Sequence, residues 1–141
     1  MLKESDVIAA VCQFLKRHDC QIEKHCAETE RGDDIVGRFA NRGARVVIEA
    51  KGETSSMAHT SRFGKPFSGS QTRDHVANAF YRAAQNVDRS TLSGVAFPKN
   101  SSHLAYADKV ATSMKKLEIE VFWVLPDRTV EVAGHWPLWK Q

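Results

Sequence analysis

The sequence lacks long apolar runs, a cysteine framework and any large excess of one charge. No run of about 18 apolar residues occurs, so no transmembrane helix is expected. The cysteines, Cys12, Cys20 and Cys26, are odd in number and form no Cys-x-x-Cys pair, which favours reduced thiols over disulfides or a zinc knuckle. The first residues are polar and unlike a signal peptide, so a cytoplasmic protein with no membrane partner is expected.

Internal divisions and histidine patterns typical of metal sites are also missing. No repeat or linker-like stretch interrupts the 141 residues, which predicts one domain spanning residues 1–141. The histidines other than His75 share no metal-ligand spacing, so we assign them no role. The net charge of +3 permits nucleic-acid binding without requiring it.

Apolar periodicity predicts helices and strands along the whole chain. Helical spacing indicates helices at 5–17, 70–87 and 102–116, with N-caps at Ser5, Ser70 and Ser102. Strand-like runs lie at 20–27, 34–40, 44–51, 92–97, 119–125 and 128–133. The order α-β-β-β-α-β-α-β-β predicts a mixed α/β (α+β) domain in which helices flank a mixed central sheet.

Three charged residues stand out in otherwise apolar strand sequence: Asp34, Glu49 and Lys51. Side chains alternate along a strand, so Glu49 and Lys51 share one face. A two-residue hairpin loop at Arg42-Gly43 would place Asp34 opposite Lys51 and within reach of Glu49. A three-residue loop would shift the pairing by one residue, and convergence would then need a bulge. The sequence leaves this register open.

Acids in an apolar strand need a cation or a proton. Two carboxylates and the carbonyl of Ala50 are the hard oxygen ligands that Mg²⁺ or Mn²⁺ prefers, and Lys51 would orient the attacking water. Asp33 competes for the role of Asp34, but its place in the strand alternation predicts the opposite face. These residues indicate metal-dependent phosphodiester hydrolysis, with Asp34, Glu49 and Lys51 as catalytic residues.

This pattern resembles the signature of the PD-(D/E)XK nuclease superfamily. Asp34 is followed, after fourteen intervening residues, by Glu49-Ala50-Lys51. The order of helices and strands from about residue 5 to residue 97 is similar to the restriction-endonuclease-like core. The resemblance implies that fold, with the aspartate on the second strand and the Glu-x-Lys on the third. It also implies a Mg²⁺- or Mn²⁺-dependent nuclease that acts on DNA.

Two further site residues follow from the resemblance alone. In such families a glutamate on the first helix often joins the metal site, and Glu4 is the matching residue here. Some branches carry a Gln-x-x-x-Tyr pattern at the start of the helix after the Glu-x-Lys strand; Gln71 matches it, and His75 replaces the tyrosine. The proline of the superfamily signature is also absent, because Gly32-Asp33 precedes the aspartate.

Each of these residues also has an ordinary structural interpretation. Glu4 suits the first turn of a helix, where the helix dipole favours an acid. Glu49 and Lys51 could form a cross-strand surface pair with their neighbours. One polar stripe on the predicted helix 70–87 lies nearly opposite its apolar face, which solvation explains best. Its residues are Gln71, His75, Asn78 and Arg82.

Residues 52–69 are rich in Ser, Gly, Thr and Lys and predict a long loop. The basic residues Arg62, Lys65 and Arg73 flank it and interleave with two phenylalanines, a pattern that suits a phosphate backbone and an unstacked base. The alternative is that the phenylalanines pack into the core. Glu53 is expected to be an exposed loop residue.

The function expected from the sequence is a small metal-dependent nuclease acting on DNA. The alternative is a nucleic-acid-binding or assembly subunit that keeps the fold without catalysis, because a fold does not determine a function. No separate target-recognition domain is present, so a homodimer or a larger complex is the expected source of specificity. The apolar tail at 134–139 is expected to pack across the sheet or against a second subunit.

Overall fold

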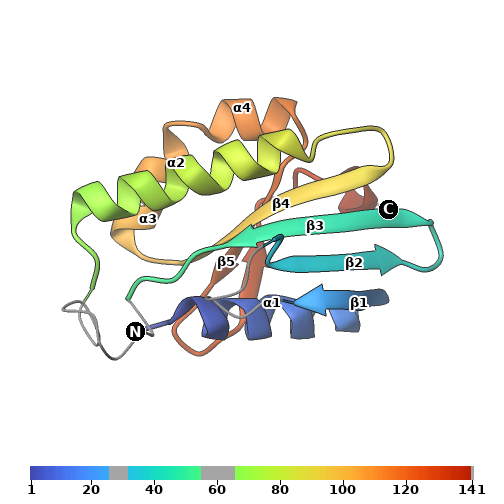
Figure 1. Ribbon diagram of the computed structural model, residues 1–141, viewed down its shortest axis with the longest axis horizontal. Coiled ribbons are helices and arrows are strands. Elements are labelled where there is room, and N and C mark those ends of the chain that lie inside the picture. The colour runs from blue at the N-terminus through green and yellow to red at the C-terminus, as the bar shows by residue number, and fades with distance from the viewer. Residues whose placement is uncertain (26–31, 55–65, 141) are drawn as a thin grey trace.

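The computed structural model describes residues 1–25, 32–54 and 66–140 (Figure 1). Its elements follow the predicted order, with one extra helix and a short 3₁₀ turn. They are α1 (Glu4–Arg17), β1 (Cys20–His25), β2 (Ile35–Phe39), β3 (Ala44–Ala50), α2 (Gly69–Gln85), β4 (Thr91–Pro98), α3 (Ser101–Asp108), α4 (Ala111–Lys116), β5 (Glu120–Val124), β6 (Val130–Val132) and η1 (Pro137–Lys140).

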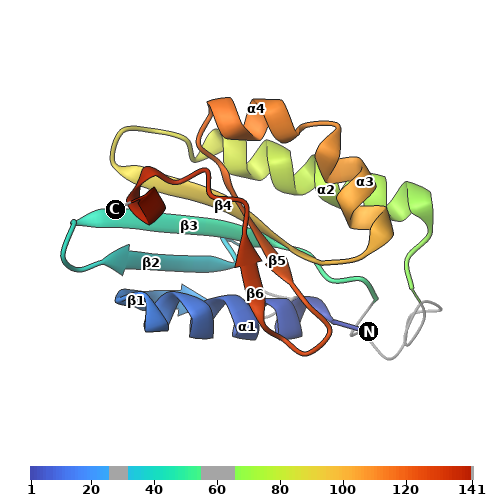
Figure 2. The same ribbon diagram turned by 180° about the vertical axis from the view of Figure 1, so that it is seen from behind.

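One mixed sheet organises the domain, with its strands in the order β1-β2-β3-β4-β5-β6. β1, β2 and β3 are antiparallel neighbours, β3, β4 and β5 are parallel neighbours, and β6 is antiparallel to β5. Figure 1 shows α2, α3 and α4 on one face of the sheet, and Figure 2 shows α1 on the other. The prediction of a mixed α/β fold with a mixed sheet flanked by helices is confirmed.

The helices begin earlier than predicted, so the three serine caps are wrong. Lys3 is the N-cap of α1, and its backbone N–H donates to Asp6 Oδ2 at 2.9 Å. The side-chain oxygens of Ser68 and Asn100 accept the capping hydrogen bonds of α2 and α3. The three predicted caps lie inside their helices instead: Ser5, Ser70 and Ser102.

The helix predicted at 102–116 is two helices, because the chain turns at Lys109 and Val110. Ala107 of α3 and Met114 of α4 both lie in the core between the helices and the sheet. The two residues are seven apart, so their spacing suits one continuous helix and does not reveal the turn. The fold therefore gains a helix that the sequence pattern merges with its neighbour.

The loop between β2 and β3 has four residues, so both predicted loop lengths are wrong. Phe39 pairs with Ala44, and the Phe39 carbonyl accepts from the N–H groups of Arg42 and Gly43 at 3.1 and 2.9 Å. Gly43 has a φ of 64°, which favours glycine. The register differs by two residues from the one predicted with a two-residue loop. An even shift leaves every side chain on its predicted face of the sheet.

Two apolar cores fill the two faces of the sheet. On one face, Val7, Val11 and Leu15 of α1 are fully buried against a group that includes Ile48 and Phe122. On the other face, the buried residues of α2, α3 and α4 pack against β4 and β5: Val76, Ala79, Ala83, Ala107 and Met114. Each helix thus buries one stripe of apolar side chains, as amphipathic helices on a sheet do.

The C-terminal tail packs across the α1 face of the sheet around a buried carboxylate. Packing across the sheet was one of the two placements predicted for it. Trp136 is fully buried, and its indole N–H donates to the Ser93 carbonyl at 2.8 Å. Glu120 is 0% exposed and accepts from three backbone N–H groups and from the indole of Trp139, at distances of 2.6 to 3.1 Å. Four N–H donors therefore satisfy this buried carboxylate.

The N-terminal segment lies against the chain that leaves β3. The backbone N–H of Glu53 donates to the Leu2 carbonyl at 2.9 Å, and Glu53 Oε1 accepts from the Leu2 N–H at 2.7 Å. Gly52 sits so close to the backbone of Lys3 and Glu4 that a Cβ at this position would clash. The predicted exposed role of Glu53 is therefore wrong, because its carboxylate ties two segments together.

Cys12 and Cys20 are buried free thiols, in agreement with the predicted reduced state, whereas Cys26 lies outside the described residues. Burial raises the pKa of the Cys20 thiol to about 11, which makes it a packing residue rather than a nucleophile. In the described part of the chain, no helix has the length and apolar character needed to span a membrane.

Candidate active site

Asp34 and Glu49 meet on the sheet face that α2 covers. Asp34 immediately precedes β2, and Glu49 is the sixth residue of β3; the β2–β3 register places them opposite each other. Asp34 is 7% exposed, and its Oδ2 accepts from the Ala50 N–H at 2.8 Å. The two carboxyl groups also hydrogen-bond to each other. The convergence predicted from strand alternation is thus present, in a different register.

Burial makes both acids harder to ionise, and Asp34 adds to the effect at Glu49. Burial, and then the neighbouring charge of Asp34, raise the pKa of Glu49 from 4.5 to about 7, although the positive charges of Lys51 and Arg82 lower it. Burial also raises the pKa of Asp34, against the Ala50 N–H, the hydrogen bond from Glu49 and the same two cations. Both carboxyl groups are therefore harder to ionise than free ones, and raised pKa values of this kind are common in functional sites.

Two cations border the acid pair. Lys51 Nζ lies 3.9 Å from Glu49 Oε1, and only 19% of the Lys51 side chain is exposed. From α2, Arg82 Nε lies 3.9 Å from Glu49 Oε2, and its terminal nitrogen lies 3.4 Å from Asp33 Oδ1. The predicted solvated role of Arg82 is wrong, because the path of α2 over β3 brings this side chain to the acids.

Asp33 is also placed differently from its prediction. It lies two residues before β2, and its side chain contacts Arg82 on the same side of the sheet as Glu49. Its side chain is 27% exposed. Asp33 therefore pairs with Arg82 at the solvent-exposed edge of the site, while Asp34 occupies the buried position.

Gln71 acts as a helix-capping residue in this structure. Its Oε1 accepts from the Ser68 N–H at 2.8 Å, and its own N–H donates to Ser68 Oγ at 3.3 Å, which is a reciprocal capping box. The carbonyl end of the side chain is thereby committed to the start of α2. This capping interaction with Ser68 accounts for the position of Gln71.

His75 lies on the same side of α2 as Gln71 but is partly buried rather than solvated. Its ring packs edge-on against Phe67, with centroids 4.6 Å apart. Burial, and then the charge of Lys51, lower the pKa of the His75 imidazole, which keeps it neutral beside that lysine. Phe67 is half-buried and contacts His75, and it belongs to neither apolar core. Phe63, the other loop phenylalanine, lies outside the described residues.

A polar network that sequence reasoning missed lies behind His75. Asn100 Nδ2 donates to Glu53 Oε2 at 2.8 Å, and Asn100 Oδ1 contacts the ring of His103 at 2.9 Å. Burial lowers the pKa of His103 to about 4, so the ring is neutral. Among the described residues, the buried His75 Nδ1 and His103 Nε2 find no hydrogen-bond partner. Glu53, two residues after Lys51, was the only signal of this network in the sequence.

Three further kinds of predicted site residue stand as follows. Glu4 begins α1, where its backbone lies against Gly52, and its predicted role in a metal site stays a prediction. Arg73 lines a groove between α2 and α3 instead of the site. Arg62 and Lys65 lie outside the described residues.

The acid pair fits a hard divalent cation. The two carboxyl groups offer oxygen ligands, and burial together with the charge of Asp34 raises the pKa of Glu49, a cost of ionisation that a dication relieves. The N–H of Ala50 donates to Asp34, whereas the N–H of Lys51 donates to Ala96 of β4 at 3.0 Å. Because backbone groups alternate sides along a strand, the Ala50 carbonyl faces the acid side of β3.

Comparisons of the chain with protein-family models, with curated proteins and with solved structures found no match. The resemblance to PD-(D/E)XK nucleases therefore rests on the Asp34 to Lys51 spacing and on the order of the elements around it.

Proposed function

We propose that this protein is a metal-dependent phosphodiester hydrolase that cleaves DNA, with the restriction-endonuclease-like fold of the PD-(D/E)XK superfamily. The observation that carries the proposal is the meeting of Asp34 and Glu49 on one sheet face, with Lys51 next to Glu49 at 3.9 Å. A structural ion pair would need one acid and one base. Two buried acids side by side are costly to ionise, which favours a functional role.

Asp34, Glu49 and the Ala50 carbonyl would hold Mg²⁺ or Mn²⁺, which binds through one or two carboxylates and keeps several waters. The bound ion would supply an acidified water and offset the negative charge of the phosphate. Lys51 would orient the attacking water by hydrogen bonding, because its ammonium group lies at the edge of the acid pair and is mostly shielded from solvent.

Arg82 would bind the phosphate group of the substrate. Its side chain is 43% exposed, more than that of Glu49 or Lys51, so it can reach a ligand without unfolding α2. In the free protein its guanidinium lies near the acids, and both contacts are long for ion pairs at 3.4 and 3.9 Å. A guanidinium fork suits a phosphate better than these distant carboxylates.

The raised pKa of Glu49 predicts the pH dependence of this site. Below about pH 7 the carboxyl pair retains a proton, which competes with a divalent ion for the same oxygens. Metal binding and cleavage should therefore both increase as the pH rises through the pKa of Glu49.

The decisive experiment incubates the protein with plasmid and single-stranded DNA in Mg²⁺, in Mn²⁺ and in EDTA. Glu49→Gln and Lys51→Met are compared with Glu131→Gln, a matched control. Glu131 is an exposed acid of β6 that pairs with Lys99 at 2.9 Å, far from the site in the sheet order. Calorimetric titration with Mn²⁺ follows metal binding in the same proteins.

Cleavage that requires the metal, disappears in both site variants and persists in Glu131→Gln would support the proposal. Cleavage that resists EDTA, or that survives in Glu49→Gln, would contradict it. Salt-dependent DNA binding without cleavage, together with no Mn²⁺ binding, would favour the non-catalytic binding subunit instead.

A further inference from the structure

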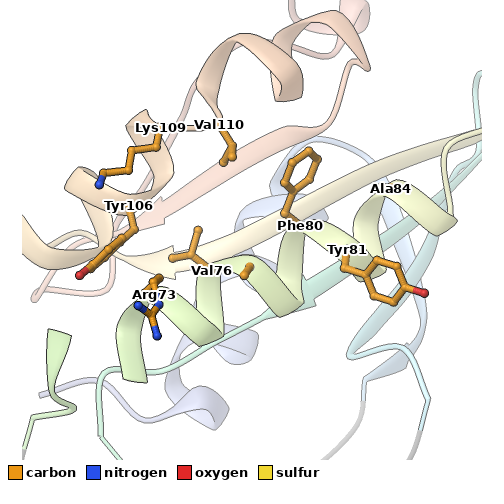
Figure 3. A pocket seen from close by; sticks show the side chains of 9 residues that line it. Arg73, Val76, Phe80, Tyr81, Ala84, Tyr106, Lys109 and Val110 are labelled. Atoms are coloured by element: carbon orange, nitrogen blue, oxygen red, sulfur yellow. The ribbon is translucent and has the colours of Figure 1, made fainter. Parts of the chain in front are cut away.

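A groove of about 420 Å³ lies between α2 and the α3–α4 segment (Figure 3). Its volume falls in the range of small-molecule pockets. Its floor and walls are apolar and come from residues spaced along one side of α2 and from the turn between α3 and α4. They are Val76, Ala77, Phe80, Ala84 and Val110.

The two charged side chains of the groove lie at one end. Figure 3 shows Arg73, Tyr106 and Lys109 at that end, with Ala84 and the exposed Tyr81 at the other. Lys109 Nζ lies 5.5 Å from the centre of the Tyr106 ring. Arg73 lies 3.4 Å from Asp74, but both side chains are more than 60% exposed, and such surface pairs hold a guanidinium weakly. Two cations are therefore available beside an apolar groove.

This groove is separate from the acid pair. Helix α2 buries Val76, Ala79 and Ala83, while Arg82 points to the acids and Arg73 lines the groove. At 100° per residue, Arg73 and Arg82 lie on opposite sides of that buried stripe. A nucleic acid bound at Glu49 would have to pass around the exposed side of α2 to reach it.

We propose that this groove binds a small amphipathic anion, whose apolar body contacts Phe80 and Val110 and whose acidic group lies between Arg73 and Lys109. The apolar lining accounts for the body of the ligand, and the pair of cations at one end accounts for its charge. An uncharged ligand would leave both cations unused, and a cation would be repelled.

The experiment uses anilinonaphthalene sulfonate, an aromatic anion that fluoresces in apolar sites, and its uncharged relative N-phenylnaphthylamine. Each is titrated into the whole protein, into Arg73→Gln/Lys109→Gln and into Ala77→Trp, which fills the groove from an exposed position of α2. The matched control is Lys16→Gln/Arg89→Gln, which removes two exposed charges elsewhere. Near-ultraviolet circular dichroism verifies that each variant is folded.

Binding of one sulfonate per chain is expected, with intermolecular contacts to the Phe80 and Tyr106 ring protons in nuclear magnetic resonance spectra. The double charge variant should weaken sulfonate binding roughly fivefold to tenfold without weakening the amine. Ala77→Trp should abolish the binding of both dyes, and the control variant should bind each dye as tightly as the natural protein does.

Three results would overturn the proposal. One is equal binding of the sulfonate to the natural protein and to the double charge variant. Another is binding that Ala77→Trp leaves unchanged, which would place the dye elsewhere. The third is a dimer that the sulfonate dissociates, because the groove would then belong to a second copy of the chain. None of these results affects the metal-dependent cleavage assay, so this inference and the proposed nuclease function fail separately.

Discussion

Replacing Glu49 by glutamine should make the protein more stable above neutral pH. The side chain is only 12% exposed, and burial next to Asp34 raises its pKa from 4.5 to about 7. Each pKa unit corresponds to about 1.4 kcal/mol, so the folded state loses roughly 3 kcal/mol when Glu49 ionises. Glutamine keeps the size of the side chain and removes the charge.

The direction of the pH dependence follows from proton binding. Below about pH 4.5, Glu49 is protonated in both the folded and the unfolded chain, so the stability is unaffected. As the pH rises toward 7, the unfolded chain releases the proton while the folded chain keeps it, and the free energy of unfolding falls. Above about pH 7 the full loss is present. The stabilising effect of glutamine should therefore be small at acid pH and largest above neutral pH.

Urea unfolding of the two proteins at about pH 5 and about pH 8.5 measures this effect. The difference between the natural sequence and Glu49→Gln cancels the contribution of His103, which titrates with a pKa of about 4 in both. Saturating Mg²⁺ at the higher pH should restore the stability of the natural protein and leave Glu49→Gln unchanged, because the ion compensates the acid pair.

A stability difference that is equal at both pH values would refute this reasoning. It would mean that the folded protein holds Glu49 with an ordinary pKa, and that the acid pair is not electrostatically strained. The site would then lose its main physical argument for binding a divalent ion. Glu131→Gln again serves as the control, because this exposed acid of β6 lies far from the acid pair in the sheet order.

Three further predictions concern buried residues and close backbone contacts elsewhere in the fold. Glu120→Gln should lower the thermal midpoint strongly, by an amount equivalent to roughly 2 kcal/mol or more, because one buried N–H then faces an amide N–H₂. The fluorescence of Trp139 should also lose its quenching or shift in wavelength. Gly52→Ala should destabilise the protein in urea and loosen the start of α1, because the new Cβ meets the backbone of Glu4; an unchanged midpoint would contradict the close approach. His103 should keep a neutral ring down to about pH 4, and the free energy of unfolding should fall as the pH drops from 6.5 toward that value; imidazole proton shifts that titrate near 6.5 would disprove this burial.

The local sequence pattern was sufficient to predict most helices and strands and the three central residues of the candidate site. Apolar spacing predicted nearly all helices and strands, and the alternation of side chains placed Asp34, Glu49 and Lys51 on one face. This result survived a wrong loop length, because the register moved by two residues and an even shift keeps every face. A shift of one would have separated the acids.

Local pattern was not sufficient for residues whose role depends on another element. Arg82 and Gln71 share one polar stripe on α2, yet the first reaches Glu49 and the second caps its own helix. The stripe looks solvated in sequence, because helical periodicity reports the angle around a helix and not the edge of the sheet over which the helix lies. Glu120 is similar: its strand sequence gives no sign of the four donors that the C-terminal tail brings.

The sequence by itself therefore determined which residues lie on the same side of a strand or helix, since those periods of two and 3.6 residues are properties of the backbone. Only the tertiary structure decided which side of α2 meets the acids, how burial raises the pKa values of two neighbouring carboxyls, and where the apolar groove with Arg73 and Lys109 lies. These features depend on contacts between segments far apart in the chain, which the packing of the helices on the sheet brings together.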